Sequence, residues 1–159
     1  MKIQKILIAV DDSKISENAA AYGFELAHAY KAHVGLVNIV APIIYPPTES
    51  DGITGLPFVN STVDDVELIK VQNESSENII QRTIKTFAKG LAVTQFTDYG
   101  STADGIISCS KEFGADLVVL GTHSRTGIDR LLMGSIAEDV VRHSDVPVLV
   151  VPLRESESQ

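Results

Sequence analysis

The chain has 159 residues, of which 44% are hydrophobic, and its formal net charge is −8 at pH 7. This hydrophobic content excludes an intrinsically disordered chain, and the length predicts one domain with a sizeable core. The acidic balance argues against a nucleic-acid-binding protein, because such proteins neutralise phosphates with clustered Lys and Arg. No apolar run approaches the roughly 20 residues that span a bilayer, so we expect no membrane segment.

The chain begins with an apolar run, a helical pattern and a second apolar run. Residues 3–10 (IQKILIAV) predict a buried strand, and Asp11 follows at once. Ser13 or Ser16 is expected to cap a helix that reaches about Tyr30. The stripe of this helix that faces the core would include Ala20, Phe24 and Ala27. A second strand is expected over residues 33–40.

A long segment without clear periodicity separates the second strand from the next helix. Residues 41–64 contain four of the six prolines and are interpreted as a functional or mobile loop. A helix is predicted from about Val63 to Ala88. Its apolar positions predict these core contacts: Val66, Ile69, Ile79, Ile80, Ile84 and Phe87. Residues 91–98 are the third predicted strand.

Two further helix and strand pairs complete the chain. Helices are predicted over residues 102–113 and 135–143, and strands over 116–120 and 147–152. The nearly continuous apolar run DLVVL is typical of a strand that is covered on both faces. Strict alternation of strand and helix predicts an α/β fold, an open five-stranded parallel sheet of order 3-2-1-4-5 with helices on both faces. The whole unit is assigned to residues 1–153, with a polar tail at 154–159.

In open sheets of this kind, ligands bind outside the carboxyl ends of the strands, where the strand order reverses. For the order 3-2-1-4-5, that point lies between the first and fourth strands. Two segments would then face each other, residues 10–13 and residues 121–135. The candidate binding site is therefore built from chain segments that lie more than a hundred residues apart.

The second of these segments, GTHSRTGIDRLLMGS, has the chemistry of a phosphate cradle. Gly121 permits close approach, and Gly134-Ser135 opens a helix whose free N–H groups and dipole favour an anion. Its hydroxyl and basic side chains are Thr122, Ser124, Thr126, Arg125 and Arg130. A purely geometric glycine loop is the alternative, but the loop coincides with the predicted reversal of strand order. Neither a Walker loop nor a Rossmann fingerprint is present.

Three segments resemble the universal stress protein family: KILIAVDDS, FTDYGSTADGI and GADLVVLGTHSRTGIDRLLMGSIAEDVVRHSDVPVLVVP. The resemblance covers nearly the whole chain and implies the fold inferred above. Members that bind ATP share the motif G-x2-G-x9-G-[ST]. Gly121 and Gly134-Ser135 match it in spacing, whereas Ser124 stands where the motif has its second glycine. Serine there either strains the backbone or adds a hydroxyl donor to the phosphates.

The resemblance implies an adenine nucleotide, ATP or else AMP or ADP, bound with Mg²⁺ and hydrolysed slowly at most. It implies these site residues: Asp11, Ile39, Gly121, Thr122, His123, Ser124, Arg125, Gly134, Ser135 and Ile136. It also implies a homodimer through the last strand, at Val148 and Val150, whose apolar edge invites pairing. No metal ligand is assigned, because the histidines are scattered. No catalytic residue is assigned, because no clear general base or nucleophile stands opposite the phosphate cradle.

Two other functions remain possible on the sequence. A family member that binds no nucleotide would act through dimerisation and protein partners, which Ser124 favours. A phosphoacceptor receiver domain would use Asp11 and Asp12, but the required Asp and Lys after later strands are missing. Asp11 itself is either a ligand contact or an acidic residue that favours a helix N-terminus. The lone Cys109 fits a buried position in a cytoplasmic protein.

Overall fold

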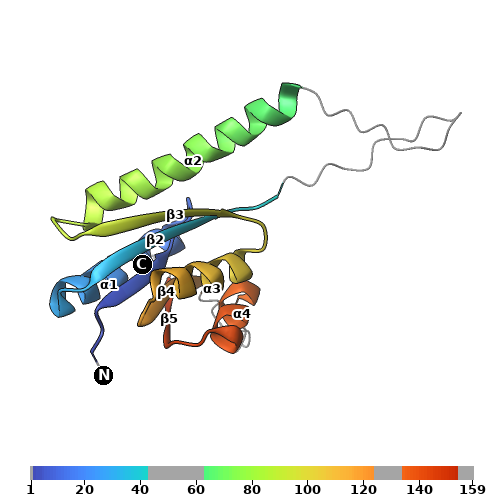
Figure 1. Ribbon diagram of the computed structural model, residues 1–159. Helices are drawn as coiled ribbons and strands as arrows, with labels where there is room; N and C mark the ends of the chain where they lie inside the picture. Colours follow the sequence, from blue (N-terminus) through green and yellow to red (C-terminus); the bar gives the residue numbers. More distant parts are fainter. Residues whose placement is uncertain (1, 43–62, 124–133, 154–159) are drawn as a thin grey trace, which may run out of the picture.

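The computed structural model describes residues 2–42, 63–123 and 134–153, and these form a twisted parallel sheet flanked by helices (Figure 1). The strand order is β3-β2-β1-β4-β5, and every neighbouring pair is parallel. The strands are β1 (Lys5–Ala9), β2 (His33–Val40), β3 (Val93–Tyr99), β4 (Leu117–His123) and β5 (Val148–Leu153). The helices are α1 (Lys14–Tyr30), α2 (Val63–Phe87), α3 (Thr102–Phe113) and α4 (Ser135–His143). The predicted α/β fold and strand order are confirmed.

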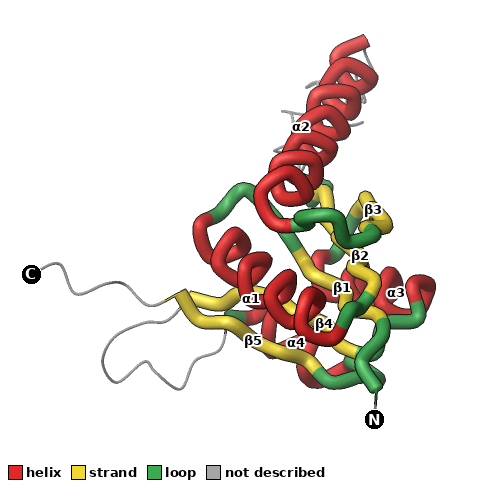
Figure 2. The backbone as a smooth tube through the Cα atoms, turned by 90° about the vertical axis from the view of Figure 1, so that its left-hand side faces the viewer, coloured by secondary structure: helices red, strands yellow, loops and turns green. Residues whose placement is uncertain are grey.

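The helices cover both faces of the sheet, as seen in the two perpendicular views (Figures 1 and 2). On one face, α1 and α2 pack against β1, β2 and β4 around buried Phe24 and Ile80. On the other face, α3 and α4 pack around buried Ile106 and Val140. Alternate residues of each strand therefore belong to different cores, which is why the central strands are apolar throughout.

Two helix ends follow ordinary capping chemistry, the start of α1 and the end of α3. Ser13 is the N-cap of α1, and its side chain accepts a hydrogen bond from the amide of Ser16 at 3.1 Å. This decides between the two candidate caps in favour of Ser13. Gly114 ends α3 at φ 67°, a left-handed conformation that glycine adopts without steric cost. The third and fourth helices have the limits that the sequence predicts.

Helix α2 departs from its prediction at the N-terminal end. Val66 is 72% exposed and Ile69 is 50% exposed, so the prediction that both contact the core is wrong. Ile80 is buried, and Ile79, Ile84 and Phe87 are partly buried against the core. Toward its N-terminus, α2 rises away from the sheet (Figure 1). An apolar stripe indicates which face of a helix would be buried, but not how far the opposing surface extends.

Strand β4 is longer than predicted. Gly121, Thr122 and His123 were expected in a loop, but they pair with Val151, Pro152 and Leu153 of β5. The pairing extends β4 because β5 runs alongside it to Leu153. Among the described residues, no helix is long and apolar enough to cross a membrane.

Candidate functional site

A cavity of about 420 Å³ opens at the carboxyl ends of β1 and β4, the position predicted from the strand order. Its walls come from the β1–α1 turn, the end of β2, the start of α3, the end of β4 and the start of α4. Among the described lining residues, Asp11 is the only one with a charged side chain. The lining residues are Ala9, Val10, Asp11, Ser13, Ile15, Ser16, Val37, Ile39, Thr102, Ile106, Leu120, Gly121, Thr122, Gly134, Ser135, Ile136 and Ala137.

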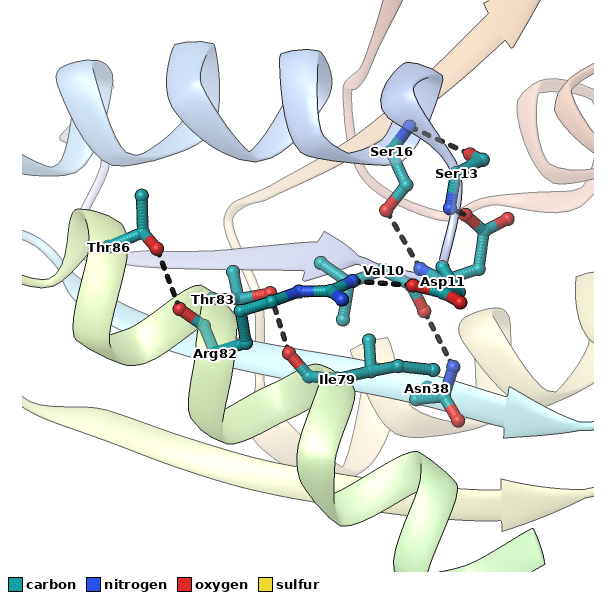
Figure 3. Close-up of polar contacts among 10 residues, drawn as sticks. Val10, Asp11, Ser13, Ser16, Asn38, Ile79, Arg82, Thr83 and Thr86 are labelled. Carbon is teal, nitrogen blue, oxygen red and sulfur yellow. Dashed lines mark hydrogen bonds and ion pairs between the residues drawn. The ribbon is translucent and has the colours of Figure 1, made fainter.

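The turn between β1 and α1 is held by a ring of short hydrogen bonds (Figure 3). The Asp11 amide donates to Ser16 Oγ at 2.8 Å, and the Ser13 amide donates to Asp11 Oδ1 at 2.8 Å. The Ser16 amide donates to Ser13 Oγ and closes the ring. The hydrogen bond from Ser13 orientates the Asp11 carboxylate. Because Asp11 is exposed at the edge of the cavity, the carboxylate remains accessible to a ligand.

Buried Asn38 supports this turn from the neighbouring strand. Its Nδ2 donates to the Val10 carbonyl at 2.8 Å, while the Val10 amide donates to the Val37 carbonyl at 2.9 Å. Asn38 thus satisfies a backbone carbonyl at the end of β1 rather than lining the cavity. The next residue along β2, Ile39, lies on the opposite face of the strand and lines the cavity.

Gly121 is required by packing within the protein. A Cβ at this position would lie 2.6 Å from Ile15 Cγ2 and 2.8 Å from the Ile15 carbonyl oxygen. The second contact is with backbone, which cannot rotate out of the way. The first turn of α1 therefore packs directly on β4, and this contact explains Gly121 without any ligand.

Gly134 has no comparable packing reason among the described atoms. It is the N-cap of α4 at φ −55°, and a Cβ there would meet Thr122 Oγ1 at 3.6 Å, an ordinary contact distance. Its amide donates to Thr122 Oγ1 at 3.3 Å. Serine, asparagine and aspartate cap helices better than glycine. Glycine here instead leaves the start of α4 open toward the cavity.

An exposed ion pair joins α2 to the outer side of the same turn. Arg82 Nη2 lies 2.7 Å from Asp12 Oδ1. The hydrogen bond to Asp12 is the main reason that the pKa of Arg82 is raised above its ordinary value. Both side chains are well exposed, so the pair contributes little to stability. Asp12 therefore faces solvent and is not among the residues that line the cavity.

The structure gathers seven predicted site residues around one cavity. They are Asp11, Ile39, Gly121, Thr122, Gly134, Ser135 and Ile136. His123 lies in β4, but its side chain is outside the described part of the chain, as are Ser124 and Arg125. Whether any of these residues binds a ligand stays a prediction.

The sequence patterns did not predict the wall that α3 contributes to the cavity. Thr102 and Ile106 of α3 line it beside Ile39. Gly105 allows α3 to lie close to Ile39 of β2, because a Cβ there would lie 2.6 Å from Ile39 Cδ1. The available signal was the position of Thr102, which starts a helix directly after a strand that ends at the ligand-binding edge.

The family model described as "Universal stress protein family" matches residues 2–152. The chain belongs to the universal stress protein family. Universal stress protein MJ0531 of Methanocaldococcus jannaschii is 31% identical over 150 residues, which cover 93% of this chain and 81% of that protein. The family resemblance stated from the sequence is therefore confirmed.

Solved structures of universal stress proteins share the fold. The protein UspA from Lactobacillus plantarum superposes with a TM-score of 0.73 at 20% identity, covering 95% of this chain and 99% of that one. A universal stress protein in complex with cAMP gives 0.68 at 22% identity, with 95% and 98% covered. The Archaeoglobus fulgidus protein in complex with dAMP gives 0.60 at 17% identity, with 95% and 99% covered.

Proposed function

We propose that this universal stress protein binds ATP or a related adenine nucleotide, such as AMP or ADP, in the cavity at the ends of β1 and β4. The ligand would place its ribose or base near Asp11 and Ile39 and its phosphates near Gly121, Thr122 and the start of α4. His123, Ser124 and Arg125 would complete the phosphate side. Mg²⁺ would enter with the nucleotide, since the described lining has one carboxylate to offer it. We further propose that the protein acts in the cytoplasm as a regulatory or stress-response module.

The observation that carries this proposal is the open helix start at Gly134. Neither its backbone conformation nor the described neighbouring atoms require glycine, yet the residue stands at the N-terminus of α4 on the cavity wall. Free amides and the helix dipole make such a position favourable for an anion. The complexes of two fold relatives with cAMP and dAMP support a ligand of this chemical class.

The first experiment is to identify small molecules released from the purified protein on denaturation by mass spectrometry. We expect an adenine nucleotide in stoichiometric or substoichiometric amount. Isothermal titration of the emptied protein with ATP and Mg²⁺, and separately with AMP, then measures affinity. Absence of binding at millimolar nucleotide would refute the proposal.

Hydrolysis is expected to be slow at most. Phosphoryl transfer relies on positioned cations and a group that orients the attacking water. The described cavity lining contributes Asp11 as its charged side chain. Turnover measured by phosphate release should therefore stay far below the roughly 1–100 s⁻¹ that is typical of kinases.

We also propose a homodimer through β5, the edge strand beside β4. Val148, Leu149 and Val150 are apolar and only half-buried in the single chain. This edge also suits the alternative function, in which dimerisation and protein partners act without a nucleotide. Replacing Val150 with Lys should convert the dimer to a monomer in light scattering after gel filtration. Val66→Lys, on the exposed end of α2, is the matched control and should leave the mass unchanged.

A further inference from the structure

The peptide unit between Val10 and Asp11 connects β1 to the turn that carries the candidate ligand carboxylate. Both of its polar atoms are bound by side chains from other elements. Asn38 of β2 donates to the Val10 carbonyl, and Ser16 of α1 accepts from the Asp11 amide, each at 2.8 Å. Asn38 and Ser16 are each 6% exposed. Water is therefore a poor replacement for either partner.

These two bonds constrain one rigid group. The carbonyl and the amide of a peptide unit lie in one plane and point in opposite directions. Rotation of the Val10–Asp11 peptide would therefore break both bonds together, and Figure 3 shows the two partners on opposite sides of it. Asp11 is held again one step later, because the Ser13 amide donates to its Oδ1. Its second carboxylate oxygen, Oδ2, is the atom that a ligand hydroxyl would meet.

We propose that Asn38 and Ser16 are positioning residues for nucleotide binding, which hold the Val10–Asp11 peptide in the orientation that presents the Asp11 carboxylate to the cavity. The inference rests on the proposed function. Asn38 gives the clearer test of this role, because Ser16 lines the cavity and Asn38 does not. We therefore expect a substitution of Asn38 to change nucleotide affinity by changing the orientation of the Val10–Asp11 peptide.

The first test is a double-mutant cycle on nucleotide affinity, with ATP and Mg²⁺ and with AMP as probes. Asn38→Ala and Ser16→Ala should each raise the dissociation constant about tenfold, the effect of losing one buried hydrogen bond in the bound geometry. The double variant should weaken binding by clearly less than the product, because either change alone releases the same peptide. Fully multiplicative effects, or unchanged affinity in Asn38→Ala, would overturn the inference.

The matched control is Ser76→Ala. Ser76 of α2 is 2% exposed and hydrogen-bonded to Thr97 Oγ1 at 3.1 Å, remote from the cavity lining. This variant also loses a buried polar contact, so it reports the effect of general destabilisation. It should change affinity less than about twofold. An equal loss of affinity in Ser76→Ala would contradict a positioning role. Should Asn38→Ala not fold, Asn38→Ser removes the reach to Val10 and leaves a small polar group.

The second test needs no nucleotide. Amide hydrogen exchange of Asp11, followed by NMR, should speed up about tenfold in Asn38→Ala although its own acceptor, Ser16, is intact. Exchange of the same amide should be unchanged in Ser76→Ala. A wild-type rate in Asn38→Ala would overturn the inference. Failure of the wild-type protein to bind any adenine nucleotide, with accelerated exchange in the variant, would instead refute the proposed function and leave the mechanical role of Asn38 in place.

Discussion

Glycine residues at the cavity serve two separable purposes. Gly121 accommodates the Ile15 carbonyl of α1, whereas Gly134 leaves the start of α4 open. Sequence spacing identifies both as motif positions but cannot separate packing from ligand access. The separation requires knowing which atoms lie opposite each missing side chain.

This difference predicts opposite outcomes for two alanine variants. Gly121→Ala should destabilise the protein by about 1–3 kcal/mol, because backbone must shift to admit the methyl group. Gly134→Ala should cost about 1 kcal/mol or less, as a weaker N-cap, yet lower nucleotide affinity about tenfold or more. Urea unfolding and calorimetric titration measure the two quantities. Unchanged nucleotide affinity in Gly134→Ala would remove the main support for a phosphate site there.

Cys109 gives a second prediction at the residue scale. It is 4% exposed, and burial is the main cause that raises its pKa from 9.0 to about 11, with Asp98 and Glu112 adding to the shift. The neutral thiol is therefore favoured by the folded state, so this stabilisation is complete below pH 9 and declines as pH rises toward 11. A thiol reagent at pH 8 should label the folded protein far more slowly than the protein in urea. Equal rates would contradict burial of the thiol.

One hydrogen bond that supports the cavity could not be predicted from the sequence. Asp11, Ile39 and the residues flanking the fourth strand follow from a motif and a topological rule. The hydrogen bond from Asn38 to the Val10 carbonyl joins residues 28 positions apart, and no residue pattern marks it. Side-chain to backbone contacts of this kind depend on strand register, which the sequence does not specify to one residue.

The limits of helices and strands were predicted best where local capping residues agree with the tertiary contacts of the element. Helix α3 ends at Gly114 and follows Ser101, so its capping residues mark both limits. The predicted fourth strand was too short because glycine is uncommon inside strands, so Gly121 was taken as its end. In the structure, the pairing with β5 continues through Gly121 to His123. In α2, the apolar pattern runs the whole length of the helix, but the sheet does not extend beneath its N-terminal part.

The two parts of α2 should respond differently to the same substitution. Ile80→Ala removes a side chain that is 2% exposed and should cost about 2–5 kcal/mol of unfolding free energy. Ile69→Ala, in the half-exposed part, should stay within about 0.5 kcal/mol. Urea denaturation of both variants provides the comparison. A large cost at Ile69 would mean that this end of the helix is covered in solution.

At the scale of the whole molecule, charge opposes the proposed ligand. A net charge of −8 repels a nucleotide phosphate chain at long range, so binding has to rely on local amides. The association rate of a fluorescent ATP analogue should therefore increase when salt rises from about 10 to about 150 mM, as the Debye length falls from about 30 to about 8 Å. Stopped-flow measurements test this, with the uncharged nucleoside as the salt-insensitive control. A rate that falls with salt would indicate a cationic entrance instead.

The contacts between α1 and the sheet have a mechanical consequence. At Gly23 a Cβ would lie 2.6 Å from Ile8 Cδ1, and at Gly121 the first turn of α1 is pressed equally close to β4. Two such close approaches along one helix resist sliding in either direction, since protein interiors are densely packed and barely compressible. We therefore expect the wall of the cavity that α1 forms to keep its position when a ligand binds, and any adjustment to occur in α3 and α4.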